Sequence, residues 1–464
     1  MKNVAFHNLG CKVNSYEIEV MQQMLQEKGY NIVGFGEVAD IYIVNTCTVT
    51  NIADRKSRQM LHRAKQKNPD AIVVAVGCYV QTGKEDVEKD ACIDLAIGNN
   101  RKKDLATILD EFLAERSSKT LHDTTVIDIN ATYEYEEMTL KQTAEHTRAY
   151  IKIQDGCNQF CSYCVIPYAR GRVRSRRAED VVKEIQGMVQ AGYREVVLTG
   201  IHISSYGIDF EEEAWKQGKS VEKHGEQQRL DYSGSSKLMD LLERIHGIEG
   251  LERIRIGSLE PRIITEENAK RLAAMRKLCP HFHLSLQSGC DETLKRMNRH
   301  YTAGEYFHSV ELLRREFDHP AITTDVIVGF PGETEEEFAQ TKAFLEQVGF
   351  YEMHIFKYSK RAGTRAAVMP KQVPDPIKTL RSNELLALEQ KQSRDFRSRY
   401  IGNEAEVLLE ETKEIDGSSF YVGHTRDYVK VALPVGEGNA VLGTNELVAV
   451  KIQDFLTDEI LLAR

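Results

Sequence analysis

The stretch Gly156-Cys157-Asn158-Gln159-Phe160-Cys161-Ser162-Tyr163-Cys164 decides the interpretation of the fold, because its three cysteines are spaced CxxxCxxC directly after a predicted strand. Three thiolates on a cubane iron–sulfur cluster leave one iron without a protein ligand, and a catalytic metal needs such an open position. The alternatives are a zinc site with a remote fourth ligand or three buried core cysteines. Zinc sites usually pair one CxxC with a second CxxC or with two histidines, and the sequence offers no such partner. The spacing therefore favours an open iron–sulfur cluster.

The cysteine stretch lies within a regular alternation of short apolar strands and amphipathic helices. Strands are predicted at Ala149–Ile153, Glu195–Thr199, Arg253–Ile256, His283–Leu286, Thr323–Val328 and Met353–Phe356. Helices are predicted between them, for example at Ala178–Ala191, Glu266–Lys277 and Glu335–Val348. This alternation predicts an α/β fold, a partial or complete (β/α)6 barrel with its site at the carboxyl ends of the strands.

A second alternation precedes it and predicts a parallel α/β sheet at the N-terminus. Its strands are expected at Val4–Phe6, Ile41–Val44, Ile72–Val76 and Leu95–Ile97, and its helices at Ser15–Lys28, Ile52–Lys67 and Arg101–Arg116. Cys11, Cys47 and Cys78 each follow one of these strands, so they should converge at one edge of the sheet. Buried small hydrophobes are the alternative for free cysteines. The flanking glycine and polar residues favour a turn and a second cluster, whereas Cys92, Cys279 and Cys290 show no pattern and are expected to be structural.

Composition shifts divide the rest of the chain. Residues 114–142 are predicted to be a linker with a strand at Thr125–Ile129, and the charged stretch Asp209–Ser236 is predicted to be an exposed insertion. A long helix is expected at Ile377–Arg399, and the short β-rich segments that follow predict a small β-barrel. The predicted domains are 1–113, a linker at 114–142, 143–375, a connecting helix at 376–400, and 401–464.

Charge and cysteine use restrict the class of protein. The chain has 464 residues with 61 basic and 70 acidic side chains, a net charge of −9, so nucleic-acid binding would have to come from a local patch. The start of the chain has no apolar run of signal-peptide length, and the longest apolar run, Ala71 to Val80, is about half a membrane span. Nine scattered cysteines do not form a secreted disulfide framework. We therefore expect a cytoplasmic protein without a membrane partner.

The CxxxCxxC stretch resembles the signature of the radical S-adenosylmethionine (SAM) enzymes. In that family SAM chelates the open iron, and one electron cleaves it to a 5′-deoxyadenosyl radical. The resemblance implies that the cysteines are catalytic ligands and that SAM is bound by the aromatic before the last cysteine, by residues at successive strand ends and by one arginine. These residues are Tyr163, Thr199, Gly200, Ser258, Glu260, Gln287, Arg299 and Val328. The alternatives are a packing aromatic, ordinary strand-end turns and a solvated arginine.

Two cysteine triads followed by a small β domain resemble the methylthiotransferases, whose last domain is a TRAM domain, an RNA-binding β-barrel. The family resemblance implies two [4Fe-4S] clusters, the second of which supplies or holds sulfur, and a reductant such as flavodoxin or ferredoxin. The stretch Leu9-Gly10-Cys11-Lys12-Val13-Asn14 is similar to the MtaB-like branch, which modifies carbon 2 of N6-threonylcarbamoyladenosine beside the tRNA anticodon. Asn8 departs from the usual threonine of that branch.

Three alternatives remain at this point: an isopentenyladenosine enzyme, an enzyme acting on a ribosomal-protein aspartate, and a non-catalytic iron–sulfur protein that binds RNA or carries electrons.

A run of arginines directly after the cluster stretch predicts the contact with the tRNA anticodon loop, since guanidinium groups match phosphate geometry. The run consists of Arg170, Arg172, Arg174, Arg176 and Arg177. The alternative is a surface run paired with acidic residues. The C-terminal residues 397–464 carry seven basic and twelve acidic side chains, so RNA binding there would need one local face, with residues such as Arg426, Lys430 and Lys451.

Overall fold

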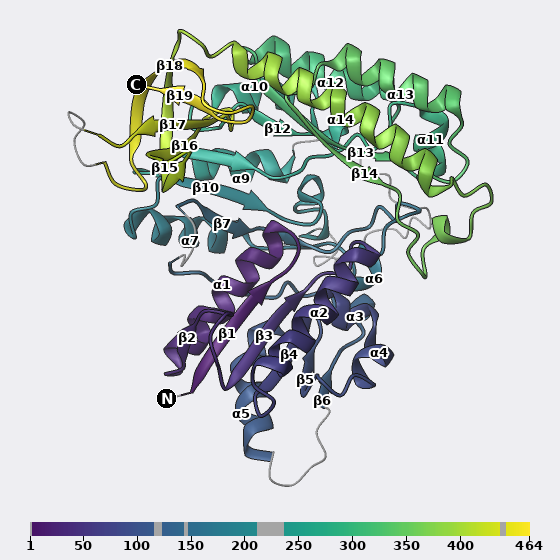
Figure 1. Ribbon diagram of the computed structural model, residues 1–464, viewed down its shortest axis with the longest axis vertical. Coiled ribbons are helices and arrows are strands. Elements are labelled where there is room, and N and C mark those ends of the chain that lie inside the picture. The colour runs from purple at the N-terminus through teal and green to yellow at the C-terminus, as the bar shows by residue number, and fades with distance from the viewer. Residues whose placement is uncertain (1, 116–122, 143–146, 211–235, 437–441) are drawn as a thin grey trace.

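The chain forms two α/β parts and a small β-barrel, as the computed structural model of the protein shows (Figure 1). The structure describes residues 2–115, 123–142, 147–210, 236–436 and 442–464. The N-terminal sheet lies on one side of the central barrel, and the C-terminal strands pack beside the far end of that barrel (Figure 1). Most of the predicted insertion at Asp209–Ser236 lies outside the described residues.

The N-terminal part is a six-stranded parallel sheet in the order β2-β1-β3-β4-β5-β6. Its strands are β1 (Asn3–Asn8), β2 (Asn31–Val33), β3 (Ile41–Thr46), β4 (Ile72–Gly77), β5 (Leu95–Ile97) and β6 (Asp123–Thr125). Its helices are α1 (Lys12–Glu27), α2 (Asn51–Lys67), α3 (Cys78–Thr82), α4 (Lys84–Glu88), the 3₁₀ turn η1 (Lys102–Asp104) and α5 (Leu105–Glu115). The central strands β3 and β4 are fully buried, which explains their continuous apolar sequence.

The segment predicted as a linker contributes to this sheet. Strand β6 pairs in parallel with β5, so the strand expected at Thr125–Ile129 lies a few residues earlier than predicted. Residues 129–131 instead form the 3₁₀ turn η2 (Ile129–Ala131). The Asp128 carboxylate accepts a hydrogen bond from the Asn130 amide at 3.0 Å, and this capping interaction competes with an extended backbone.

The central part is a partial barrel of six parallel strands. They are β7 (Ala149–Lys152), β10 (Glu195–Thr199), β11 (Arg253–Ile256), β12 (His281–His283), β13 (Ala321–Val328) and β14 (Glu352–Lys357). The three-stranded sheets β11-β10-β7 and β12-β13-β14 are joined by single parallel bridges such as Leu259–Leu284. The short hairpin of β8 (Gln154–Asp155) and β9 (Arg174–Ser175) flanks the cysteine loop.

Helices and 3₁₀ turns follow the barrel strands; most of the helices cover the outer face, whereas α6 packs against α3 of the N-terminal part. The helices are α6 (Ile166–Ala169), α7 (Ala178–Gln190), α9 (Lys237–His246), α10 (Glu266–Ala274), α11 (Asp291–Arg296), α12 (Ala303–Glu316), α13 (Glu335–Val348) and α14 (Asp375–Ser398), with the 3₁₀ turns η3 (Ile203–Ser205), η4 (Pro261–Ile263) and η5 (Arg365–Val368). The strand predicted at His283–Leu286 lies earlier in the chain, at His281–His283. Regular pairing ends at His283 because the Thr324 hydroxyl takes over, donating to the Leu284 carbonyl and accepting from the Leu286 amide.

The C-terminal residues form a closed five-stranded barrel, which confirms the predicted small β-barrel. Its strands are β15 (Glu404–Ile415), β16 (Ser418–Thr425), β17 (Lys430–Pro434), β18 (Leu447–Phe455) and β19 (Leu461–Ala463). It docks on the amino-terminal end of the central barrel, where Arg253 donates to the carbonyl groups of Glu406 and His424. Within the described residues, no helix has the length and apolar character needed to cross a membrane.

Candidate functional site

The cysteine stretch folds as a loop that leaves β8 and is clasped by the residues after α11. The Cys157 amide donates to the Gly171 carbonyl at 3.0 Å, and the Ser162 amide donates to the Met297 carbonyl at 2.9 Å. The Asn298 side chain donates to the Phe160 carbonyl at 3.1 Å. At Gly156 the backbone φ is +73°, and a Cβ there would lie 1.8 Å from the Arg172 carbonyl oxygen. This glycine lets β8 and the returning chain approach closely enough to form the loop.

Two predicted SAM-site residues lie against this loop. The Arg299 guanidinium donates to the Cys161 sulfur at 3.3 Å, and it also donates to the Tyr301 hydroxyl. The Tyr163 ring packs edge to face on Phe330, with 6.3 Å between ring centroids. Phe330 belongs to the tight turn after β13, so the last cysteine and that turn lie side by side.

The ends of β10 and β11 meet through a histidine. Thr199 is buried at the end of β10, and Gly200 packs against Gln154, whose side-chain oxygen accepts from the His202 amide at 2.8 Å. The His202 ring lies 3.6 Å from a carboxylate oxygen of Glu260. Although burial alone would raise its pKa, hydrogen bonds from His202 and Arg262 hold the pKa of Glu260 well below its usual range. Glu260 is therefore a buried carboxylate at the carboxyl edge of the barrel.

Further residues complete that edge. Gln287 has a left-handed backbone, with a φ of +74°, and bridges to Val326 of β13. Val328 is buried at the end of β13, and its carbonyl accepts from the Tyr358 amide. Ser258 is exposed. Apart from Arg299, which follows α11 and contacts the cysteine loop, the predicted SAM-site residues thus lie at the carboxyl ends of the strands or on that loop.

Cys11, Cys47 and Cys78 converge at the carboxyl edge of the N-terminal sheet, after the neighbouring strands β1, β3 and β4. A Cβ built on Gly10 would lie 3.2 Å from the Cys47 sulfur, which places the first loop against the second. Cys78 directly follows β4, and the Asn99 side chain donates a hydrogen bond to its sulfur at 3.5 Å.

The polar residues that flank these cysteines hold the three loops together. The Asn14 side chain donates to the Thr46 carbonyl, and the Asn45 side chain donates back to the Asn14 carbonyl at 3.0 Å. The Thr46 hydroxyl donates to the Val76 carbonyl at 2.6 Å. These bonds explain why the sequence carries turn-forming polar residues here rather than core residues.

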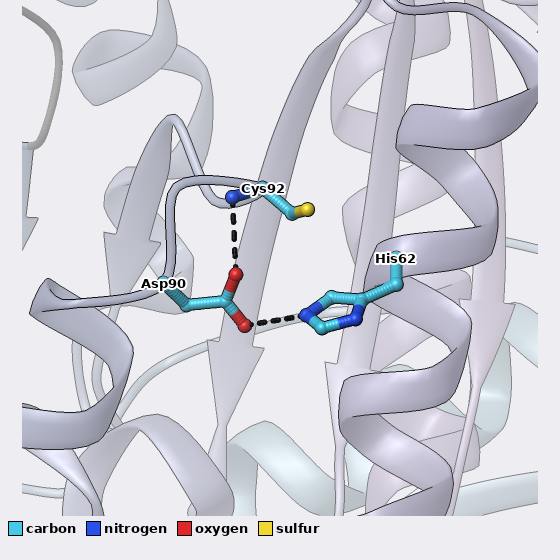
Figure 2. A group of neighbouring side chains, drawn as sticks. All are labelled: His62, Asp90 and Cys92. Atoms are coloured by element: carbon cyan, nitrogen blue, oxygen red, sulfur yellow. Dashed lines mark hydrogen bonds and ion pairs between the residues drawn. The ribbon is translucent and has the colours of Figure 1, made fainter.

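The spacing of the sulfur atoms tests which metal group the triads fit. Within the described residues, two groups have three ligand atoms within 4.8 Å of one another: His62, Asp90 and Cys92 (Figure 2), and His283, Asp325 and His354. Neither cysteine triad meets this limit. Three thiolates on one zinc ion would lie about 3.8 Å apart, given a Zn–S bond of about 2.3 Å. At least two sulfur atoms of each triad are thus farther apart than two thiolates on one zinc ion would be.

Burial raises the pKa of a thiol in each triad. Burial, and then the neighbouring Cys161, raise the pKa of the Cys164 thiol to about 12. Burial, with smaller effects from Cys78 and Cys11, raises the pKa of Cys47 to about 11. A coordinating metal deprotonates a thiol outright, so a bound cluster would offset this effect of burial.

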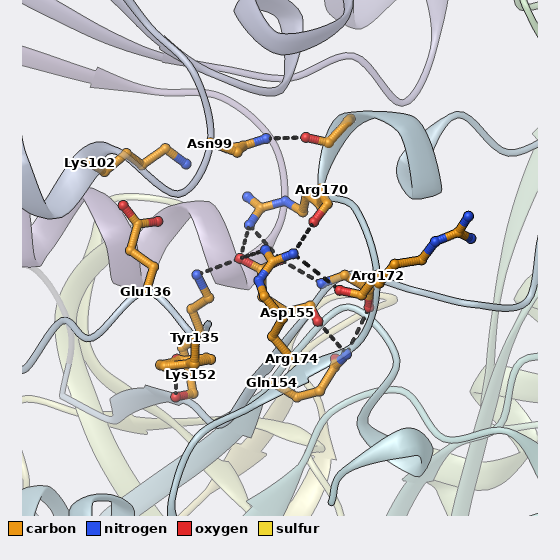
Figure 3. A network of polar contacts seen from close by, with 12 residues as sticks. Asn99, Lys102, Tyr135, Glu136, Lys152, Gln154, Asp155, Arg170, Arg172 and Arg174 are labelled. Atoms are coloured by element: carbon orange, nitrogen blue, oxygen red, sulfur yellow. Dashed lines mark hydrogen bonds and ion pairs between the residues drawn. The ribbon is translucent and has the colours of Figure 1, made fainter. Parts of the chain in front are cut away.

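A buried polar network joins the two triads, and Figure 3 shows the part of it around Arg170, Asp155 and Lys152. Arg170 donates to Asp155 beside the cysteine loop at 3.1 Å, to Glu17 of α1 at 2.9 Å, and to the Asn14 side chain at 2.6 Å. Lys152 binds both carboxylates at 2.7 Å. Burial opposes ionisation here, but Arg170 and Lys152 hold the pKa of Glu17 and of Asp155 well below the usual range.

A second bridge runs through the turn between β14 and α14. Arg361 donates to the Thr48 hydroxyl at 2.7 Å, next to Cys47, and forms an ion pair with Asp54 at 2.5 Å. In the same turn, the Ala366 amide donates to the Ser162 carbonyl at 2.8 Å. Sequence reasoning missed Arg361, Asn99 and His202, because each lies far along the chain from the site residue that it contacts or flanks.

The structure corrects the predicted arginine contact with RNA. Arg170, Arg174 and Arg176 are at most 1% exposed. Arg174 donates to the Arg170 and Arg172 carbonyl groups, and Arg176 is paired with Glu184. Arg176 also donates to the Thr139 hydroxyl. These three guanidinium groups stabilise the site from its interior. Of the run, only the half-buried Arg172 and the exposed Arg177 are accessible to a phosphate. The Arg172 guanidinium lies over the Phe160 ring at 4.5 Å.

Comparison with known proteins agrees with this architecture. The radical SAM superfamily matches residues 151–345, and uncharacterized protein family UPF0004 matches residues 3–98. Among solved structures, the radical SAM methyltransferase TsrM from Kitasatospora setae, with cobalamin and a [4Fe-4S] cluster bound, aligns with a TM-score of 0.54 at 15% identity. The alignment covers 79% of this chain and 77% of that chain, and shows a shared fold.

Curated relatives extend the match to nearly the whole chain. The threonylcarbamoyladenosine tRNA methylthiotransferase MtaB of Bacillus subtilis is 40% identical over 93% of this chain and 90% of its own length. The MtaB of Aquifex aeolicus is 39% identical over 89% of this chain and 94% of its own length. A tRNA-2-methylthio-N(6)-dimethylallyladenosine synthase of Moorella thermoacetica is 34% identical over 96% of this chain and 94% of its own length. The chain therefore belongs to the radical SAM methylthiotransferase family.

Proposed function

We propose that this chain inserts a methylthio group at carbon 2 of N6-threonylcarbamoyladenosine, next to the anticodon of a tRNA. The observation that carries the proposal is the convergence of two cysteine triads that one buried network joins through Arg170. The curated relatives at 40% and 39% identity are both named for this tRNA nucleoside.

The cofactors of the family are SAM and [4Fe-4S] clusters. In the proposed assignment, Cys157, Cys161 and Cys164 hold the SAM cluster, and Cys11, Cys47 and Cys78 hold the second one. When bound, these groups supply a radical that removes hydrogen from an unactivated carbon and the sulfur that replaces it. The chain itself orients them, because Arg299 fixes Cys161 and the Arg170 network fixes one triad against the other.

The carboxyl edge of the central barrel is the proposed SAM-binding site. Tyr163 packs on Phe330 in the tight turn that follows Val328 and β13, and this apolar surface suits an adenine ring. Thr199, Gly200, Ser258, Glu260, Gln287 and Arg299 supply the polar groups around it. Glu260 stays ionised there, so it is available to accept hydrogen bonds from a ribose or an ammonium group.

The proposed partners are the anticodon loop of a tRNA and a reductant such as flavodoxin or ferredoxin. Arg172 and Arg177 offer the phosphate contacts beside the cysteine loop, and the C-terminal barrel acts as a TRAM-like RNA-binding domain. Arg426 of that barrel is already engaged, since it donates to the Leu278 carbonyl at 2.9 Å. In the proposed division, residues 1–113 hold the second cluster, 143–375 form the radical SAM domain and 401–464 form the RNA-binding barrel. Residues 114–142 are the linker and 376–400 the connecting helix. The proposed location of the enzyme is the cytoplasm.

Two other substrates define the competing proposals. Relatives at 34–35% identity are named for dimethylallyladenosine in tRNA, so that nucleoside is the second candidate. A ribosomal-protein aspartate is less favoured, because every relative described above is named for a tRNA nucleoside.

The test is anaerobic cluster reconstitution, followed by assay with SAM, dithionite and tRNA from a strain that lacks the gene. The expected products are 5′-deoxyadenosine and the 2-methylthio form of N6-threonylcarbamoyladenosine, both identified by mass spectrometry. Methylthiolation of dimethylallyladenosine alone would select the second candidate. Absence of 5′-deoxyadenosine would overturn the radical SAM assignment.

A further inference from the structure

The inner face of the central barrel is unusually polar. Along β13, Ile322 and Val326 are buried in the apolar core under the helices, whereas the alternate residues Thr323 and Asp325 face the barrel interior. The same alternation on the neighbouring strands directs Tyr150, Glu195, Arg253, Arg255, His281 and His283 inward. We call this inner face the barrel lumen.

The charges around the lumen are mostly paired. Arg148, just before β7, forms an ion pair with Glu410 at 3.3 Å. Arg255 binds Glu195 at 2.9 Å, and Arg253 lies between Glu195 and Glu406. The loop after β16 closes the amino-terminal end of the lumen, where the Tyr428 ring lies under Arg148 and Arg255. A ligand therefore enters from the opposite, carboxyl end, where both cysteine triads lie.

Lys12 is the exception to this pairing. It is exposed, begins α1 and directly follows Cys11, and α1 packs along β7 at the open side of the barrel (Figure 1). Its ammonium group lies within electrostatic range of Arg148, Arg255 and Glu195. In the part of the chain that the structure describes, Lys12 has no hydrogen bond or ion pair.

Arg148, Arg253 and Arg255 each have a carboxylate partner among Glu195, Glu406 and Glu410. His281 adds no charge, because burial, and then Arg255 and Lys12, lower its pKa well below the usual value. Unlike these arginines, Lys12 has no carboxylate partner in the described residues, and it lies next to the second triad.

We propose that Lys12 binds the carboxylate of the threonyl group on the substrate nucleoside and so determines which modified adenosine the enzyme accepts. This inference rests on the proposed function. Carbon 2 must approach Cys11, Cys47 and Cys78 to receive sulfur, and the N6 substituent starts two ring positions away. A threonylcarbamoyl group carries one carboxylate, whereas an isopentenyl group carries none. The Lys12 ammonium group can form a charge-assisted hydrogen bond with the threonylcarbamoyl carboxylate. The isopentenyl group offers no such partner, so this contact favours the threonylcarbamoyl nucleoside.

The experiment compares Lys12→Gln, Lys12→Arg and wild type as reconstituted holoenzymes, with Lys89→Gln as a control at an exposed lysine of the same N-terminal part. Each protein is given an anticodon stem-loop with N6-threonylcarbamoyladenosine, and the same RNA with the threonyl carboxylate converted to its neutral methyl ester. The readouts are the RNA Kd by fluorescence anisotropy, KM and kcat for methylthiolation, and iron per chain.

The expected result is that wild type prefers the carboxylate over the ester about ten- to a hundredfold in Kd and in kcat/KM. Lys12→Gln loses that preference because it binds only the carboxylate RNA more weakly, mainly with a higher KM. Lys12→Arg retains most of the preference. Lys89→Gln behaves like wild type. A structural role for Lys12 would instead change both RNAs equally or lower the iron content.

The inference is overturned if wild type does not distinguish the two RNAs, or if Lys12→Gln keeps the wild-type preference or weakens both substrates equally. These outcomes differ from failure of the proposed function, in which wild type methylthiolates neither RNA although SAM is cleaved.

Discussion

Cys157, Cys161 and Cys164 lie on one short loop, whereas Cys11, Cys47 and Cys78 come from three separate strands of a parallel sheet. The first triad lies within one loop, which bends at Gly156 and is held from outside by Met297 and Asn298. The second is positioned by strand register, with Asn14, Asn45 and Thr46 tying one strand end to the next.

The two cysteine triads are therefore positioned by separate sets of contacts, and further contacts fix one triad relative to the other. Local geometry survives changes in the N-terminal sheet, while convergence of distant strand ends depends on the whole sheet. The Arg170 network and the Arg361 turn are the parts that make two sites into one. The two triads should therefore be separable by mutation, and the network should respond to mutation differently from either of them.

The largest effect is expected from Cys157→Ala/Cys161→Ala/Cys164→Ala. Loss of these ligands should reduce formation of 5′-deoxyadenosine to the level of cluster-free protein, and iron should fall from about eight to about four per chain. Cys92→Ala is the matched control, because Cys92 lies outside both triads, beside His62 and Asp90. Retained SAM cleavage in the triple variant would refute the assignment of the first cluster.

The second triad should give the complementary result. Cys11→Ala/Cys47→Ala/Cys78→Ala should keep SAM cleavage within a few-fold of wild type, because Arg299 and the cysteine loop are unchanged, but should form no methylthio product. Product analysis and iron determination on the same sample check both statements. If this variant still held about eight irons per chain, the two-cluster assignment would be wrong.

Arg170→Gln should act on the connection between the triads. It leaves Glu17 and Asp155 buried with one fewer cation, and breaking a buried pair of this kind costs about 3–5 kcal/mol. We expect a lower unfolding midpoint together with weaker coupling of SAM cleavage to product. Arg244→Gln, which breaks an exposed ion pair with Glu179, should leave the midpoint nearly unchanged. Equal midpoints for the two variants would contradict the network's role.

The sequence predicts the first triad almost completely, because its information is contained in one short stretch. It also predicts the second triad's convergence, since Gly10, Asn45 and Gly77 indicate turns at parallel strand ends. Neither Arg361 nor Asn99 could be predicted, because their partners are set by tertiary packing and not by spacing along the chain.

The arginine run shows where sequence reasoning fails. Clustered arginines predict a phosphate-binding surface only if they are exposed, and Arg170, Arg174 and Arg176 are buried by carboxylates and carbonyl groups from distant segments. The same applies to β6, which the polar composition of residues 114–142 hides until its parallel pairing with β5 is known.

The smallest effect is expected at the exposed end of that run, where Arg177→Gln should weaken tRNA binding without affecting the clusters. Loss of one phosphate contact should raise the Kd about two- to fivefold and reduce the slope of log Kd against log salt by about one. Fluorescence anisotropy across a salt series measures both, with Arg315→Gln on the outer helix α12 as an exposed control. The slope, rather than the affinity alone, identifies a phosphate contact, because a general loss of fold would change binding without changing the number of ions released. An unchanged slope for Arg177→Gln would assign RNA binding away from the arginine run and towards the C-terminal barrel.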